Sequence, residues 1–203
     1  MLSLLAPSAV AVTTSAQYMS PLNKDRPQRK TTQYIILHTT EGGAAGALKK
    51  MRDNGECHYL VSTNGVIYRI IDRNKFAPHA GLSLWDGRYD ISTVSVGIEV
   101  VGYHDKPPTA AQVKSLRDLL KELKKLYAIP DTRVLTHSMV AYGEPNKWHP
   151  KKHRGRKRCG MVFADSGLRL RLGIAAKPAY DHDLRAGRLT NADPELTRIL
   201  YKK

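Results

Sequence analysis

Cysteine is scarce in this chain, and long apolar runs are missing. The two cysteines, Cys57 and Cys159, are too few for a disulfide framework and lie too far apart to form a CxxC metal knuckle. No stretch reaches the roughly 18 apolar residues in a row that a membrane-spanning helix needs. Internal repeats and low-complexity tracts are also missing. We therefore expect one compact domain, because 203 residues are enough to bury a sizeable core.

The chain has far fewer acidic than basic side chains. The chain has 33 Lys and Arg against 18 Asp and Glu, a formal net charge of +15. This excess favours a polyanionic partner, which could be nucleic acid, an anionic membrane surface or an anionic cell-wall polymer. Seven basic residues lie between Lys147 and Arg158, but paired zinc knuckles and an aromatic RNA platform do not accompany them. Nucleic acid is therefore not expected as a partner, although it stays the second alternative.

The N-terminus has an apolar run followed by small residues, with an Ala-x-Ala step at Ala9 to Ala11 that favours an export signal. It lacks the basic residue expected near Met1, so an N-terminus without a signal is the alternative. Residues 21–30 are polar, contain two prolines and are typical of a linker. We expect an export-signal-like segment and linker at 1–30, a domain at 31–163 and a C-terminal extension at 164–203 that packs on it. The expected location is the cell envelope, periplasmic or secreted, with the cytoplasm as the alternative.

Short apolar runs alternate with helical patterns along the chain. Residues 94–101 alternate strictly, which places Glu99 on one face of a strand beside the small side chains of Ser95 and Gly97. Two β-rich runs flank the turn pair Asn64-Gly65 and predict a hairpin. Further strands are expected at 34–37 and 133–136, and helices at 44–53, from Thr109 and from Asp193. This alternation predicts an α/β fold, a sheet with helices packed on it.

Two histidines, His38 and His137, each follow a short apolar strand. Their side chains come together if those strands are neighbours in the sheet. A catalytic zinc site needs three protein ligands and one open position. Cys159 can be the third ligand, and Lys157 lies two residues before it, on the same side of an extended segment. A cation beside a thiol favours the thiolate, which is the form that binds metal.

Each of these residues also has a plainer interpretation. A single histidine after a strand is more often a core or turn residue than a ligand. The stretch KKHRGRKRCG at 151–160 could be a solvated basic loop with an uninvolved cysteine. His149 and His153 lie between His137 and Cys159 and are rival ligands.

Six blocks of sequence resemble a known family. They are YIILHTTEG, CHYLVSTNGVIYRIID, HAGLSLWDG, VSVGIEVVG, VLTHSMVA and RKRCG. In their order and approximate spacing they are similar to the zinc-dependent N-acetylmuramoyl-L-alanine amidases of the amidase 2 family, which resemble the peptidoglycan recognition proteins. The similarity runs from about residue 31 to residue 163. It implies a single α/β domain, with a mixed central sheet flanked by helices and a zinc-binding groove.

The resemblance also implies roles for individual residues. His38 and His137 match the two histidine ligands of zinc, and Cys159 matches the third ligand, at which many members carry aspartate. Glu99 matches a glutamate that handles the proton in bacterial relatives, and Lys157 matches the lysine two residues before the third ligand. The insert between His137 and Cys159 is longer than the family's usual loop.

Three further residues are expected to contact substrate: His79, Tyr59 and Trp85. His79 belongs to the HAGLSLWDG block, although a histidine bonded to backbone is an equal alternative. Trp85 could stack on a sugar face, with a core aromatic as the alternative. The resemblance also sets Cys57 where relatives carry a tyrosine close to the zinc. We hypothesise that Cys57 and Cys159 can oxidise to a disulfide when zinc is missing.

The expected function is a peptidoglycan hydrolase that cleaves the linear amide between N-acetylmuramic acid and L-alanine of the stem peptide. The expected cofactor is Zn²⁺. The expected partners are peptidoglycan or muropeptides and anionic cell-wall polymers, and the protein is expected to be a monomer. A non-catalytic peptidoglycan-binding module is the first alternative. Retention of all three candidate ligands and Glu99 favours the enzyme.

Overall fold

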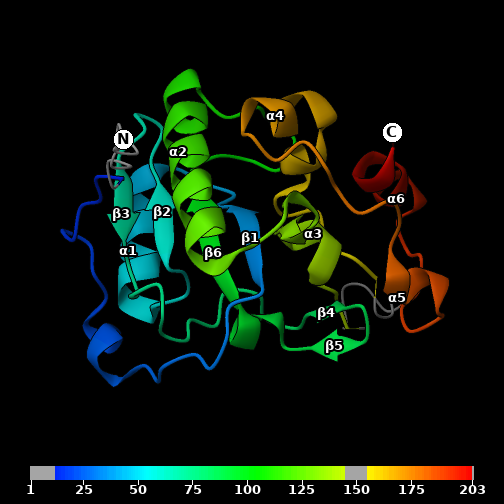
Figure 1. Cartoon of the computed structure of the whole chain (residues 1–203), viewed down its shortest axis with the longest axis horizontal. Helices are drawn as coiled ribbons and strands as arrows, with labels where there is room; N and C mark the ends of the chain where they lie inside the picture. Colours follow the sequence, from blue (N-terminus) through cyan, green and yellow to red (C-terminus); the bar gives the residue numbers. More distant parts are fainter. Residues whose placement is uncertain (1–11, 145–154, 203) are drawn as a thin grey trace, which may run out of the picture.

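A computed structural model describes residues 12–144 and 155–202 (Figure 1). Its main sheet has five strands in the order β3-β2-β6-β1-β7. Strands β2, β6, β1 and β7 are parallel to one another, and β3 is antiparallel to β2. The expected mixed sheet is therefore confirmed. The strands are β1 Tyr34–Thr39, β2 Tyr59–Val61, β3 Ile67–Arg69, β6 Ser95–Val100 and β7 Val134–Thr136.

The helices form where the sequence predicts the longer ones. Thr109 caps α2: its hydroxyl accepts a hydrogen bond from the Gln112 backbone, and the Gln112 side chain accepts one from the Thr109 backbone. The helices are α1 Ala44–Asn54, α2 Ala110–Tyr127, α3 His137–Val140, α4 Ser166–Arg171, α5 His182–Arg185 and α6 Pro194–Tyr201. A small hairpin, β4 Leu84–Trp85 and β5 Arg88–Tyr89, lies below α3 in Figure 1.

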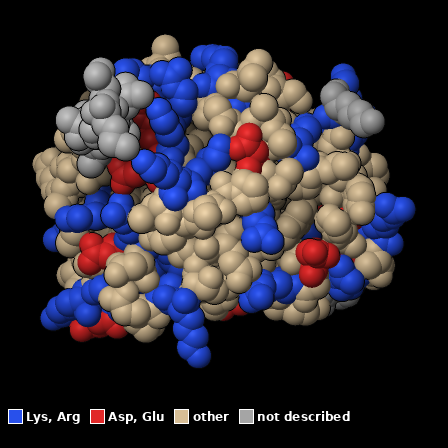
Figure 2. All heavy atoms as spheres, viewed as in Figure 1, with Lys and Arg blue, Asp and Glu red and all other residues tan. Residues whose placement is uncertain are grey.

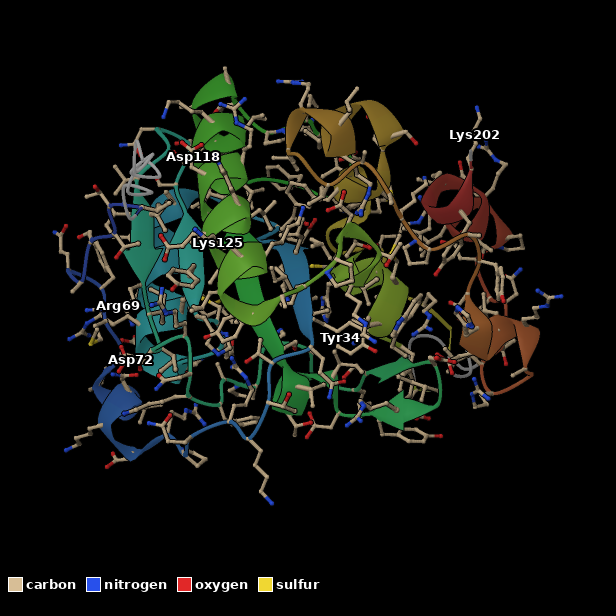
Figure 3. The ribbon with its side chains drawn as sticks, viewed as in Figure 1. Tyr34, Arg69, Asp72, Asp118, Lys125 and Lys202 are labelled. Atoms are coloured by element: carbon tan, nitrogen blue, oxygen red, sulfur yellow. The ribbon has the colours of Figure 1, made fainter. Side chains whose placement is uncertain are left out.

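The two faces of the sheet are covered differently. Ile35, Leu37 and Ile98 pack against Leu116 and Leu120 of α2, which crosses in front of the sheet in Figure 1. The outer side of α2 is polar, and Lys125 there is exposed (Figure 3). Apolar side chains thus continue without a break across the α2 face of the sheet.

The opposite face carries two separate apolar clusters. One joins Leu60 of β2 to Leu48 of α1, and the other joins Ile36 of β1 to Leu135 of β7. On β6, between those two pairs of strands, the residues on this face are Ser95, Gly97 and Glu99, because Val96, Ile98 and Val100 face α2. A polar row therefore runs through the middle of an otherwise apolar face.

The segment that the sequence predicts to be a linker is packed on the domain. Residues 21–25 form a 3-10 helix, and Asn23 donates a hydrogen bond to Asp72 at 2.9 Å. Arg29 lies partly buried and donates to the backbone carbonyls of Arg73 and Lys75. Polar residues here satisfy buried backbone oxygens instead of facing water. The export-signal motif at Ala9 to Ala11 lies outside the described residues.

The C-terminal extension also packs on the domain. Leu196 and Leu200 of α6 are buried in the cluster that contains Ile36 and Leu135. The fully buried Arg169 donates to the carbonyls of Val134, Asp131 and Ala176. Within the described ranges, no helix is long and apolar enough to cross a lipid bilayer.

Candidate metal centre

Three neighbouring parallel strands bring the polar site residues to one place. His38 of β1 is the register partner of Glu99 on β6, and the His38 Nδ1 atom lies 3.7 Å from a Glu99 carboxylate oxygen. His137 follows β7 directly and begins α3. The His38 and His137 ring centres are 4.3 Å apart. The two histidine rings therefore lie close together, as expected from the sequence.

Cys159 reaches the same place from a turn that closes onto β1. Its thiol lies 3.4 Å from the Thr39 carbonyl oxygen, to which it donates. Gly160 has a positive φ of 74°, and a Cβ there would lie 2.4 Å from the Leu37 carbonyl oxygen. Its backbone N–H donates to the Thr39 hydroxyl at 2.9 Å. Only glycine allows so close an approach, and that approach holds Cys159 beside His38.

These three side chains form a group that could hold a metal ion. Each of His38, His137 and Cys159 offers one ligand atom, and those atoms lie within 4.8 Å of one another. The Nδ1 atom of His137 is buried and has no hydrogen-bond partner. A buried nitrogen without a partner is costly unless something else binds it. Two imidazole nitrogens and one sulfur are a donor set that suits zinc.

The protonation states of the histidines favour metal binding. Burial lowers the pKa of His137 to about 4, and the charge of Lys157 adds to the effect. Burial lowers the pKa of His38 well below its ordinary value, and the neighbouring histidines add to the effect. Both rings are therefore neutral near pH 7, which is the form that binds a metal ion.

The pKa of the Cys159 thiol is raised, whereas a neighbouring cation would lower it. Burial raises the pKa of Cys159 to about 12, with the Glu99 charge as a further cause. Hydrogen bonds with Thr39 act in the opposite direction. Stabilisation of the thiolate by the exposed Lys157 stays a prediction. Metal binding at Cys159 would have to displace the thiol proton.

Glu99 is buried beside the three candidate ligands. Its side chain accepts no hydrogen bond at Oε2. Burial raises the pKa of Glu99 to about 8, while Lys50 acts in the opposite direction. A carboxyl group with such a pKa can both take up and release a proton near neutral pH. Glu99 is therefore suited to proton transfer at this site.

Two arginines on either side of Lys157 fix this part of the basic stretch to the C-terminal extension. Arg156 is buried and forms a bidentate ion pair with Asp181, at 2.7 and 3.0 Å. Arg158 forms a second bidentate pair with Asp193, at 2.8 and 3.1 Å. At residues 156–159, these ion pairs hold the stretch against the C-terminal extension. The stretch is the segment that delivers Cys159.

The buried ion pair yields a stability prediction. Asp181→Asn keeps the shape of the side chain but removes the bidentate counter-charge of the buried Arg156 guanidinium, which then keeps its ion pair with Asp183 at 3.2 Å. We expect the free energy of unfolding to fall by about 3 to 5 kcal/mol. Urea unfolding measures it, with Glu195→Gln as the matched control because the exposed Glu195 pairs with Arg158 at the surface. That control should cost at most about 1 kcal/mol. Equal losses in the two variants would contradict the prediction.

Two of the predicted substrate-binding residues are placed elsewhere. Tyr59 pairs in register with Ile98, so it lies on the α2 face, opposite to Glu99. Its side chain is 3% exposed, and burial raises its pKa to about 12. Trp85 is 5% exposed and packs in an apolar cluster with Leu196. A side chain must reach solvent to contact a sugar, so the burial of Tyr59 and Trp85 does not favour these two predicted contacts, which stay predictions.

His79 is also buried, and both of its ring nitrogens have protein partners. Its Nδ1 atom lies 3.1 Å from Nε2 of His38, and its Nε2 atom lies 3.0 Å from the Ser95 hydroxyl. The predicted contact of His79 with substrate is therefore replaced by a contact with a candidate ligand. One feature of the sequence could have predicted this buried position of His79: the glycine at position 97, which leaves room for the ring.

The remaining histidine and cysteine predictions have different outcomes. His58 is structural, as expected: its Nδ1 atom accepts from the Gly97 backbone at 2.9 Å. The rival ligands His149 and His153 lie outside the described residues. Cys57 is fully buried in the cluster around Leu48, and both cysteines are free. The disulfide between Cys57 and Cys159 stays a prediction.

Comparisons with known proteins give the relatives of this chain. The chain is 36% identical over 85 residues to the 1,6-anhydro-N-acetylmuramyl-L-alanine amidase AmpD of Haemophilus influenzae, a match that covers 41% of this chain and 46% of that relative. It is 27% identical over 124 residues to the N-acetylmuramoyl-L-alanine amidase AmiD of Escherichia coli, covering 53% of this chain and 45% of that relative. The chain thus spans less than half the length of these curated relatives.

Solved structures share the fold. AmpDh3 of Pseudomonas aeruginosa matches with a TM-score of 0.55 and 19% identity, covering 92% of this chain and 71% of that one. The Escherichia coli AmiD structure, a complex with the substrate anhydro-N-acetylmuramic acid-L-Ala-D-gamma-Glu-L-Lys, matches with a TM-score of 0.51 and 23% identity. That match covers 62% of this chain and 52% of that one.

The family model described as N-acetylmuramoyl-L-alanine amidase matches residues 28–152, which is more than half of the chain. The matched range contains His38, Glu99 and His137 and ends before Cys159. The chain therefore belongs to the amidase 2 family.

Proposed function

We propose that this chain is a zinc-dependent N-acetylmuramoyl-L-alanine amidase that hydrolyses the amide between N-acetylmuramic acid and L-alanine of peptidoglycan stem peptides. One observation carries the proposal: a member of the amidase 2 family brings His38, His137 and Cys159 together beside a buried glutamate. Membership of the family alone would also fit a module that only binds peptidoglycan.

His38, His137 and Cys159 would hold the zinc ion. The partnerless Nδ1 atom of His137 and the neutral state of both histidines support this assignment. Three protein ligands leave one position open, as in catalytic zinc sites. When bound, zinc supplies Lewis acidity, which polarises a carbonyl group and makes water a stronger acid near neutral pH.

Two residues of the chain would handle proton and charge. Glu99 accepts a proton from the attacking water and delivers it to the departing nitrogen of L-alanine. Its burial beside the ligands and its raised pKa, about 8, support this role. Lys157 would stabilise the negative charge that develops on the carbonyl oxygen. Two observations support this role: Lys157 is exposed, and its charge lowers the pKa of His137.

The net positive charge fits an anionic partner such as the cell wall. Figure 2 shows Lys and Arg side chains spread over the face that α2 covers, with fewer acidic side chains among them. That face is opposite to the candidate site, so its charge would hold the protein on a polyanion without blocking the substrate. Such an attraction weakens with salt, because the Debye length is about 8 Å at physiological ionic strength.

The first experiment measures metal content and the release of stem peptides from purified peptidoglycan sacculi. An amidase frees intact stem peptides that begin with L-alanine, and a chelator should abolish the release. A binding module would cosediment with sacculi and release nothing. Assays on sacculi and on anhydro-muropeptides in parallel would identify the substrate, and N-terminal sequencing of the protein from its host would test the proposed envelope location.

A further inference from the structure

His79 connects a candidate ligand to the backbone through an unbroken series of hydrogen bonds. From His38 Nε2 the series runs to His79 Nδ1 at 3.1 Å and from His79 Nε2 to the Ser95 hydroxyl at 3.0 Å. The Ser95 hydroxyl then contacts the Ile91 carbonyl oxygen at 2.7 Å. All three side chains are buried: His38 is 1% exposed, His79 is 7% and Ser95 is 0%.

The carbonyl at the end of this series fixes its direction. A carbonyl oxygen only accepts, so the single hydroxyl proton of Ser95 must point at Ile91. The Ser95 oxygen then accepts from Nε2–H of His79, which leaves Nδ1 of His79 as an acceptor. His38 must therefore donate through Nε2–H, and its Nδ1 atom carries the free lone pair. That atom is the one on the Glu99 side of the ring.

Ala80, the residue after His79, fixes the tautomer of His137. The Ala80 carbonyl oxygen accepts from Nε2 of His137 at 3.1 Å, which leaves Nδ1 of His137 free and without a partner. The Ala80 backbone N–H donates to the Ser92 hydroxyl at 2.9 Å and anchors this segment. Residues 79 and 80 thus place both imidazoles in the same tautomer.

The sheet is built to admit the His79 ring. A Cβ on Gly97 would lie 2.3 Å from the ring carbon Cγ of His79, so any other residue at position 97 would displace the ring. The ring therefore fills the space that glycine leaves on β6. Its place is set by the backbone and not by a ligand.

We propose that His79 is a positioning residue that holds His38 in the tautomer with a free Nδ1, with the Ala80 carbonyl holding His137 in the same way. The inference rests on the proposed metal site. It assigns His79 to support of a ligand, not to contact with substrate. Loss of such an outer partner typically weakens metal affinity about 10- to 100-fold.

Two variants separate this role from space filling. His79→Asn keeps an acceptor where Nδ1 stands but loses much of the ring, whereas His79→Phe fills the space and offers no acceptor. We expect His79→Asn to keep zinc affinity within a few-fold of the parent and His79→Phe to lose about 10- to 100-fold, measured by competition with a chelator. The reverse order would show a space-filling role, and unchanged affinity in both variants with a raised KM would show a substrate contact. Either result overturns the inference.

A measurement on the parent chain tests the proposed tautomers without relying on variants that could fold differently. Nitrogen-15 chemical shifts of the metal-free protein report the tautomer of each histidine. His38 and His137 should both carry their proton on Nε2, and a proton on Nδ1 of His38 would overturn the proposal. If the parent chain binds no zinc at all, the proposed function fails instead, so the two failures are distinguishable.

Discussion

Replacement of Glu99 by glutamine is expected to lower kcat for stem-peptide release by about 10²- to 10⁴-fold, with zinc content and fold retained. Glutamine has nearly the same shape as glutamate but cannot accept and return a proton. Glu99 makes no hydrogen bond through Oε2 and is 8% exposed. A neutral amide therefore fits the same buried space without the cost of burying a charge.

The assay compares kcat, zinc stoichiometry and urea unfolding for Glu99→Gln and a matched control. Glu41→Gln is that control, because Glu41 is an exposed carboxylate near the site that bonds to His104 and Thr39. It should change kcat by no more than a few-fold. Near-normal turnover by Glu99→Gln would remove Glu99 from the mechanism, whereas a loss of zinc would show that Glu99 supports the metal instead.

The sequence predicts the direction of a side chain best where a single strand sets that direction. The two-residue period of β6 places Glu99 opposite to Ile98 wherever that strand lies in the sheet. The short apolar runs before His38 and His137 likewise predict that both histidines lie at the carboxyl ends of their strands. Local periodicity suffices for the direction of Glu99, whereas the meeting of His38 and His137 also requires that β1 and β7 are neighbours in the sheet.

The burial of Tyr59 and of Trp85 depends on information that one strand does not carry. The face on which Tyr59 lies is set by its register with Ile98 on a neighbouring strand, and register involves residues far apart in sequence. Trp85 is buried in a cluster to which the C-terminal extension contributes, and the residues around Trp85 do not predict that contact. The pairing of Arg156 with Asp181 joins residues whose contact only the folded chain creates.

Replacement of Cys159 by alanine is expected to abolish zinc binding and amidase activity together. The other two candidate ligands would remain, but two imidazoles do not complete the set of three that a catalytic zinc site uses. Zinc content after dialysis should fall from about one ion per chain to near zero. Because Cys159 is partly exposed at the end of a turn, its loss should leave the fold intact.

Two companion variants make this test specific. Cys57→Ala removes the other thiol, which is fully buried in the cluster with Leu48, so it should lower stability but keep zinc and activity. Cys159→Asp restores an anionic ligand of a type that zinc accepts, so it should regain zinc binding that Cys159→Ala lacks. If Cys159→Ala keeps full zinc stoichiometry and activity, the ligand set is wrong. The same measurements on His149→Ala and His153→Ala would then identify the third ligand.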